Sequence, residues 1–221
     1  MHAFVGAAIA AMLSMILHAS PAQAANARAQ LNDFSQGVQN LSAGFEQSVF
    51  TAEDEELDKT SGTLVLARPN RFRWDYLTPE EQRIIADGDN IWIYDVELEQ
   101  VSVRPQSPDE QQSPLAVLLD LNSLDEQFAS DETGEKDGAE WMRLKPRAKE
   151  PQFAHIDLGF RDSRLVRMVM VDIVGQRTEI VFADWKRNTT LPPGTFQFEP
   201  PAGVDVVGEV HQGPKTQAIP D

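Results

Sequence analysis

The spacing of hydrophobic residues along the chain changes at about residue 44. Ala27, Leu31, Phe34, Val38 and Leu41 recur every three or four residues, which predicts one apolar stripe on a helix of about four turns. From residue 45 onward, apolar and polar residues alternate instead. Alternation is typical of half-buried strands, so most of the chain is predicted to form an antiparallel sheet.

The alternating segments indicate about ten or eleven strands, separated by turn-forming residues every eight to twelve positions. They cover residues 45–50, 63–67, 72–76, 83–86, 91–94, 100–103, 141–145, 153–160, 164–174 and 177–184, with a short last strand around 196–198. An acidic hairpin tip is expected at 53–58, and residues 131–138 are expected to form a polar loop.

One segment interrupts the alternation. Ser113 and Pro114 form an expected helix start, and the residues that follow, up to Leu121, are apolar on nearly every side. We call residues 113–121 the lid segment, whose apolar side chains Leu115, Val117, Leu118 and Leu119 should be buried or should plug a cavity. A further helical turn is indicated over 122–128. The elements together predict one α+β domain, an open, unclosed antiparallel β-barrel with helices across one mouth.

The N-terminus has the pattern of a cleaved secretory signal. Residues 3–17 form an apolar run that is shorter than the ~20 residues needed to cross a bilayer. A break at Ser20-Pro21 and the A-x-A pattern Ala22-Gln23-Ala24 follow it, so cleavage is expected after Ala24. The chain then divides into a signal peptide (1–24), a globular domain (25–207) and a polar tail (208–221) that we expect to be disordered.

Composition narrows the range of functions. The 221 residues hold 35 acidic and 19 basic side chains, a net charge of −16, which disfavours binding to nucleic acid or to an anionic membrane surface. The chain has no cysteine, so disulfides, thiol catalysis, Cys₄ zinc sites and lipid attachment through cysteine are excluded.

The motifs of common enzymes are missing. Beyond the signal only His155 and His211 remain, so there is no paired-histidine metal ligand set. Neither a G-x-S-x-G elbow nor a G-x-x-x-x-G-K-[ST] phosphate loop occurs, and with 35 acidic residues no particular carboxylate pair is informative. We therefore expect a binding protein, with no catalytic residue, no metal and no cofactor.

An arginine at the end of a strand needs an explanation of its own. Strand parity places Leu64, Leu66 and Arg68 on one face. If this face points inward, the Arg68 guanidinium is buried and needs acceptors, and helix C-terminal carbonyls are suitable. Arg68 would then latch the apolar lid segment. An ordinary solvated arginine is the alternative, and the residues alone leave both open.

Three sequence blocks in this order resemble a known family. They are Phe45-Glu46-Gln47-Ser48-Val49, the G-x-L-x-L-x-R-P-N-x-F-x-W block from Gly62 to Trp74, and the D-G-x-x-I-W-x-Y-D block from Asp87 to Asp95. The chain resembles the periplasmic outer-membrane lipoprotein carrier family, LolA, over nearly its whole length, from about Leu31 to Val204. This chain differs from the family pattern in that Arg71 and Arg73 flank Phe72.

The resemblance implies a fold and a site. The fold is an open β-barrel closed by a helical lid over an apolar cavity for lipoprotein acyl chains, with Arg68 holding the lid closed through helix backbone groups. The phenylalanine of the same block, Phe72, is associated with that cavity. We assign the remaining inward aromatic and aliphatic positions to it as well: Trp74, Leu64, Leu66, Trp92 and Tyr94.

The resemblance also implies partners and a compartment. Family members act in the periplasm, take acylated lipoproteins from an inner-membrane ATP-driven (ABC transporter) releasing complex, and deliver them to an outer-membrane receptor of the same fold, LolB-like and itself a lipoprotein. Because this chain has no cysteine to acylate, it resembles the carrier and not the receptor, and we expect a monomer. Two alternatives are a periplasmic lipid or lipoprotein sensor on the same fold and a secreted hydrolase with a polar cleft.

Overall fold

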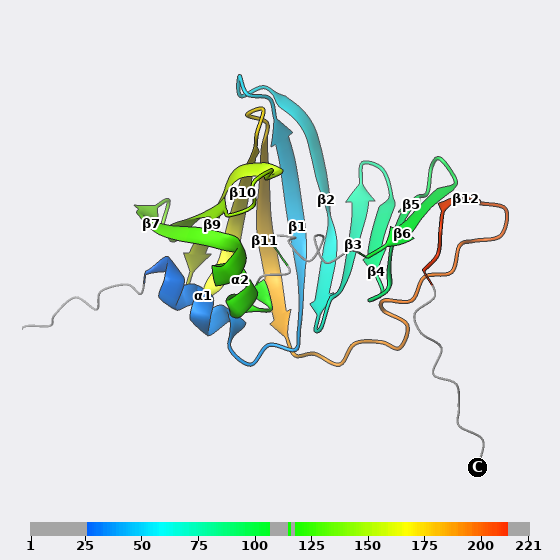
Figure 1. Cartoon of the computed structure of the whole chain (residues 1–221), viewed down its shortest axis with the longest axis horizontal. Coiled ribbons are helices and arrows are strands. Elements are labelled where there is room, and N and C mark those ends of the chain that lie inside the picture. Colours follow the sequence, from blue (N-terminus) through cyan, green and yellow to red (C-terminus); the bar gives the residue numbers. More distant parts are fainter. Residues whose placement is uncertain (1–25, 107–114, 116–117, 212–221) are drawn as a thin grey trace, which may run out of the picture.

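A computed structural model describes residues 26–106, 115 and 118–211 of the chain (Figure 1). The two helices of this part are α1 (Ala27–Ser35) and α2 (Leu121–Gln127). The strands are β1 (Asn40–Phe50), β2 (Glu56–Ala67), β3 (Arg71–Thr78), β4 (Gln82–Ala86), β5 (Asn90–Asp95), β6 (Gln100–Pro105), β7 (Phe128–Lys136), β8 (Ala139–Pro146), β9 (Phe153–Arg161), β10 (Arg164–Asp172), β11 (Arg177–Arg187) and β12 (Asp205–Gly208).

All twelve strands of the described residues belong to one sheet that does not close. Their order is β12-β6-β5-β4-β3-β2-β1-β11-β10-β9-β8-β7, and every pairing is antiparallel except that of β12 with β6. The sheet curves around α1 and α2, which lie together on its concave side (Figure 1). The predicted α+β class and the open barrel are therefore confirmed, with one strand more than the upper expected number.

The order of the strands dictates where the lid segment runs. β6 and β7 follow each other in the chain, yet β6 lies next to one edge of the sheet and β7 forms the other. Their connection has to cross a face of the sheet, and its described residues Leu118 and Leu124 belong to the core of the concave face. The topology itself thus places an apolar segment across the mouth of the barrel.

The main core fills the space between the concave face and the helices. Phe34 of α1 is 1% exposed and packs edge-on against Trp185, with ring centroids 5.1 Å apart. Its ring also lies 6.3 Å from that of Phe160 on β9. Leu31, one turn earlier on the same face of α1, is fully buried. The apolar stripe that the sequence predicts is thus the contact between α1 and the sheet.

α1 is shorter than the spacing predicts. Val38 and Leu41 are buried as expected, but the helix ends at Ser35, because Gly37 adopts a positive φ of 67° that helical residues do not have. The Asn188 side chain then stabilises the turn: its oxygen accepts from the Gln39 N–H at 2.7 Å. Leu41 is a residue of β1, so the predicted helix of four turns is wrong in its second half.

The predicted polar loop at 131–138 is wrong, since most of it belongs to β7. This strand is an edge strand, where polar side chains are favoured because one side of the strand has no partner. One of its acids also has a structural role. Glu132 accepts hydrogen bonds from the backbone N–H groups of Ala27 at 3.1 Å and Arg28 at 2.9 Å, and so caps the start of α1.

Two expectations concern the ends of the chain. The signal peptide at 1–24 lies outside the described residues. The tail was expected to be disordered from residue 208, but Gly208 pairs with Val103 in the sheet, and the His211 backbone N–H donates to the Asn90 side chain at 2.6 Å. For 208–211 that expectation is wrong, and 212–221 lie outside the described residues.

Replacing Phe34 by alanine should lower the free energy of unfolding by about 3–5 kcal/mol, because it leaves a cavity between α1 and the sheet. Chemical denaturation measures the change. The matched control is Leu98→Ala, since Leu98 is 70% exposed and its truncation should stay within about 0.5 kcal/mol. Equal losses in the two variants would show that α1 adds nothing to the core.

Candidate functional site

An apolar cavity of about 940 Å³ lies on the concave face of the sheet, next to the lid segment. Its volume falls in the range of cavities that bind small molecules. The large apolar side chains of the lining come from six strands, the start of β7 and the lid segment: Phe72, Trp74, Tyr76, Ile84, Ile91, Leu115, Phe128, Phe153, Met168, Met170 and Ile180. Pro146, Ala148 and Pro151, at and after the end of β8, complete the apolar lining. Polar side chains are Gln47, Arg104, Glu126, Gln127, Arg147, Glu150 and Gln152.

An aromatic wall forms one side of this cavity. Alternation along β3 turns Phe72, Trp74 and Tyr76 toward the concave face, as the sequence predicts. Phe45 of β1 packs against the wall from the neighbouring strand, with its ring centroid 4.5 Å from that of Trp74 and 5.4 Å from that of Tyr76. Burial raises the pKa of the Tyr76 hydroxyl, which shares a hydrogen bond with the Gln47 side chain.

The alternate residues of β3 point to the other face of the sheet. Arg73 forms an ion pair with Asp75 at 2.7 Å and donates to the Thr195 carbonyl oxygen at 3.3 Å. The Arg71 guanidinium lies 5.2 Å from the centre of the Phe196 ring. The arginines that distinguish this chain from the family pattern therefore hold the C-terminal segment against the outer face and do not enter the cavity.

Of the six residues assigned to the cavity from sequence, Phe72 and Trp74 line it. Leu64 and Leu66 are buried in the same core cluster but are not part of the lining. Trp92 and Tyr94 were assigned to the wrong face: they belong to a second apolar cluster.

The reason for this error is that both faces of β5 are apolar. Ile91 lines the cavity, so parity turns Trp92 and Tyr94 outward, where Phe198 covers both at centroid distances of 5.6 and 5.7 Å. The Phe196-x-Phe198 spacing was a signal that a second apolar face needed a cover. Sequence reasoning also missed Tyr76, Phe153 and the two cavity methionines as lining residues, because nothing in alternation alone shows which strands flank an opening.

Three described residues of the lid segment are buried, and Asp120 and Leu121 at its end are half-buried. Leu115, Leu118 and Leu119 all belong to the main core, and the Leu118 N–H donates to the Leu115 carbonyl at 3.2 Å. The predicted helix over this segment is not confirmed: α2 begins only at Leu121, after a turn at Leu119. Val117 lies outside the described residues.

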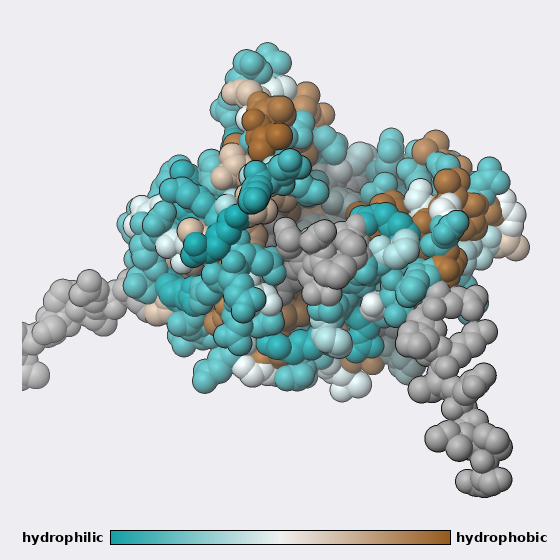
Figure 2. Space-filling view, in the orientation of Figure 1, coloured by the Kyte–Doolittle hydropathy of each residue, from teal (hydrophilic) through white to brown (hydrophobic). Residues whose placement is uncertain are grey.

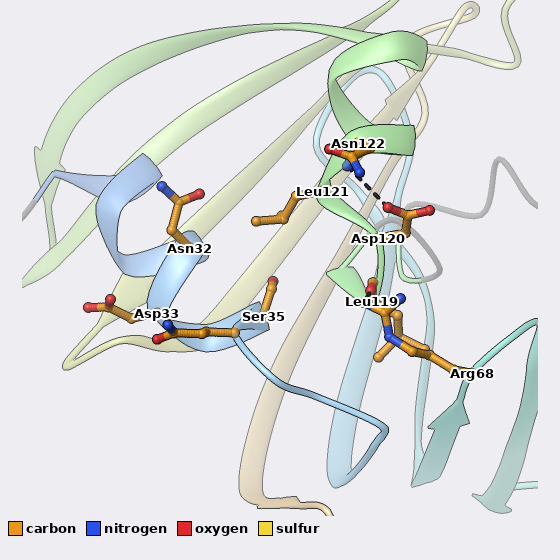
Figure 3. Close-up of a pocket in the computed structure, with 9 residues that line it drawn as sticks. Asn32, Asp33, Ser35, Arg68, Leu119, Asp120, Leu121 and Asn122 are labelled. Atoms are coloured by element: carbon orange, nitrogen blue, oxygen red, sulfur yellow. Dashed lines mark hydrogen bonds between the residues drawn. The ribbon is translucent and has the colours of Figure 1, made fainter.

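Arg68 bridges two segments that are remote in sequence. Its Nε donates to the Val38 carbonyl at 2.9 Å, and a terminal guanidinium nitrogen donates to the Leu119 carbonyl of the lid segment (Figure 3). Its own backbone N–H donates to the Gln39 carbonyl at 3.0 Å. The expected acceptors were carbonyls at a helix C-terminus, but Leu119 precedes a helix and Val38 follows one. Arg68 is exposed as a residue while its two side-chain hydrogen bonds are partly buried, so it makes the bond to the lid segment without the buried guanidinium that an inward-pointing face would require.

Arg68 borders a second pocket, a polar one of about 450 Å³ between α1 and the start of α2 (Figure 3). Asp120 in this pocket is the N-cap of α2 and accepts from the Ser123 hydroxyl at 2.9 Å and the Asn122 N–H at 3.1 Å. The hydrogen bond from Ser123 holds the pKa of the Asp120 carboxyl below its ordinary value of 3.8, and the bonds from backbone N–H groups and the Arg68 charge act in the same direction.

Metal-ligating side chains do not cluster in the described residues 26–106, 115 and 118–211. Within them, no three His, Asp or Glu side chains come together in a way that could hold an ion. His155 on β9 faces Asp157 at 3.7 Å, and burial together with the charge of Arg143 lowers the pKa of its imidazole. No helix of the same residues has the length and apolar character to cross a membrane.

The surface around the lid segment is mixed in character. Figure 2 shows hydrophobic residues gathered on the strand ends above it and along the edge of the sheet that carries β5, β6 and β12, with hydrophilic residues over most of the rest of this face. The exposed large apolar side chains at these places include Leu57 of β2 and Val206 and Val207 of β12.

Comparison with known proteins bears on what the cavity does. The family model described as "Outer membrane lipoprotein carrier protein LolA" matches residues 36–199. A protein of Xanthomonas campestris pv. campestris (strain B100) named outer-membrane lipoprotein carrier protein is 43% identical over 201 residues, which cover 90% of this chain and 96% of that protein.

A second relative with the same name, from Dechloromonas aromatica (strain RCB), is 38% identical over 199 residues, 90% of this chain and 93% of its own. Among solved structures, an uncharacterised conserved protein from Thermus thermophilus matches with a TM-score of 0.53. At 16% identity, covering 81% of this chain and 95% of that one, this likeness supports the fold alone.

The capping interaction of Asp120 should make the start of α2 sensitive to acid. Because the pKa of the folded state lies below the unfolded value of 3.8, the carboxylate stabilises the fold above that value and loses this contribution as the pH falls through the folded pKa. Amide hydrogen exchange of Asn122 and Ser123, measured between about pH 6 and about pH 3, should show faster local opening at the acidic end.

The control is Asp120→Asn, which keeps an N-cap oxygen but cannot titrate. Its local protection relative to the wild type should be lower at the upper end of this pH range, and the difference should narrow toward the lower end. A constant difference between the two proteins over the whole range would contradict the role given to the charge.

Proposed function

The chain belongs to the outer-membrane lipoprotein carrier family LolA, and on this premise we propose that it binds lipoprotein acyl chains in the cavity beneath the lid segment. It is a carrier that keeps the lipid part of outer-membrane lipoproteins out of water during transport. The observation that carries the assignment of the site is the apolar cavity of about 940 Å³, walled by the aromatic side chains of β3.

The energy of binding sets a condition on such a carrier. Burying one chain of about 16 carbons at ~0.8 kcal/mol per methylene yields about 12 kcal/mol. Three chains would exceed the practical limit of non-covalent affinity and could not be released. A segment that fills part of the site when cargo is absent offsets this gain, since apolar surface is then buried in both states. The buried lid residues Leu115, Leu118 and Leu119 supply such a segment.

Arg68 is the latch of this lid. Each charge-assisted hydrogen bond to a carbonyl is worth about 1.5–3 kcal/mol, and Arg68 makes one to the lid and one to the segment after α1. Phe72 and Trp74 contact the acyl chains from the cavity wall, while Leu64 and Leu66 support that wall from within the core. Val117 has the same role as the other lid residues.

The path that we propose for the cargo follows from the free energy needed to open the lid. Opening the lid and loading cargo require work, and the sequence has no nucleotide-binding motif. An inner-membrane ABC transporter complex that releases lipoproteins supplies this work, and an outer-membrane receptor of the same fold takes the cargo. The protein acts in the periplasm between the two as a monomer.

A triacylated lipoprotein released from spheroplasts should appear in solution only together with this protein. Native mass spectrometry of the mature chain should show a one-to-one complex, which transfers its cargo to outer membranes that carry the receptor. A matched variant with a charge in the cavity wall, Phe72→Glu, should not form the complex, because an acyl chain cannot solvate a carboxylate. Cargo that stays in the membrane despite intact releasing machinery would contradict the carrier function.

Replacing Arg68 by leucine should leave loading intact and impair release. Without its latch the lid competes less well with cargo, so the transfer equilibrium should shift by about tenfold or more toward the loaded carrier. Transfer of a labelled lipoprotein to receptor-containing membranes measures the shift. The control is Arg164→Leu on β10, an exposed arginine far in sequence from the lid segment. Transfer equal to that of the wild type would rule out the latch.

A further inference from the structure

One tryptophan of the chain differs from the other three in its hydrogen bonding. Trp92 donates its indole N–H to Asp87 at 2.8 Å, Trp141 to the Lys136 carbonyl at 3.0 Å, and Trp185 to the Leu165 carbonyl at 2.6 Å. Trp74 Nε1 is removed from solvent and has no acceptor among the described residues. Of these four residues, Trp74 is also the one that lines the apolar cavity.

Neighbouring groups do not satisfy this donor. Trp74 is held in the middle of the sheet, in register with Leu64 on β2 and Ile84 on β4, and its ring packs against Phe45. The nearby Tyr76 hydroxyl is engaged with Gln47. A buried donor without an acceptor costs folding free energy, and phenylalanine would fill an apolar wall without this cost.

The chemistry of the indole limits what could be its partner. The indole N–H is a donor only, so the missing group must be an acceptor. Inside an acyl-chain site the ligand offers one strong acceptor per chain, the carbonyl oxygen of its ester or amide bond. The hydrocarbon part of the chain offers none.

We propose that Trp74 Nε1, which is shielded from solvent in this structure, becomes accessible when cargo enters and then donates a hydrogen bond to an acyl carbonyl oxygen of the bound lipid, so that the cavity selects acyl chains over alkyl chains. The proposal rests on the proposed function and adds a polar contact to it. The contact fixes how far along the cavity an acyl chain sits, since the carbonyl stands at the start of the chain. Gln127 Oε1 is a second buried atom without a partner in the described lining of the same cavity. It would accept a donor such as the N–H of an amide-linked chain.

Two synthetic lipopeptides that differ only in their linkage test the proposal. One carries two ester-linked hexadecanoyl chains on a glyceryl-cysteine peptide, and the other carries two ether-linked hexadecyl chains. The full mature protein should bind the ester about tenfold more tightly than the ether in isothermal titration calorimetry, the factor expected for one hydrogen bond to a buried group. In Trp74→Phe, which removes the donor but keeps an aromatic ring, the two affinities should become equal, through loss of ester binding alone.

The control variant is Trp141→Phe, the same exchange at an indole outside the cavity lining, and it should keep the preference of the wild type. Thermal unfolding of Trp74→Phe checks that the variant is folded under the conditions of the titration, since the smaller ring loses packing against Phe45 but no internal hydrogen bond. Equal affinity of the wild type for ester and ether, or a preserved preference in Trp74→Phe, would overturn the inference alone. If the wild type binds neither lipid, the proposed function fails as well.

Discussion

The connection between β6 and β7 is the constraint on which the rest of the structure depends. Two strands that are consecutive in the chain lie near opposite ends of a twelve-stranded sheet, so the segment between them must traverse one face. An exposed crossing would leave a row of leucines in water. Burial of Leu118 and Leu124 against the concave face avoids this, and the sheet curves around them. The cavity is the part of the concave face that the described residues of this crossing do not cover.

A single sheet with two apolar faces needs a cover on each side. On the concave side, α1 and the lid segment provide it, and a bidentate ion pair of Arg28 with Asp125 at 2.6 and 2.7 Å joins the two helices. On the other side, the extended segment with Phe196 and Phe198 lies over β3 to β5. The outer cover supports the sheet from behind, while the concave cover contains the lid segment that the proposed function displaces when cargo binds.

Sequence patterns predicted local structure well where one physical factor dominates. On β3, alternation of aromatic with charged residues assigns both faces correctly, because the arginines have polar partners on one side and the rings have the core on the other. It failed for β5, where Trp92 and Ile91 are both apolar and only the tertiary arrangement decides which one faces the cavity. β7 was missed because an edge strand tolerates the composition of a loop. Arg68 contacts Leu119, which is 51 residues away in the sequence, and no local pattern encodes Val38 and Leu119 as its acceptors.

The two carbonyls that share the Arg68 guanidinium belong to segments that are far apart in the sequence. Val38 lies in the turn that joins α1 to β1, and Leu119 lies in the segment across the cavity. One donor group therefore couples the lid segment to the turn after α1. If displacement of the lid breaks the hydrogen bond between Arg68 and Leu119, the two events are thermodynamically linked. A ligand or substitution that strengthens this hydrogen bond then weakens cargo binding in the cavity by the same free energy. The cavity under the lid and the turn after α1 thus form a single thermodynamic system.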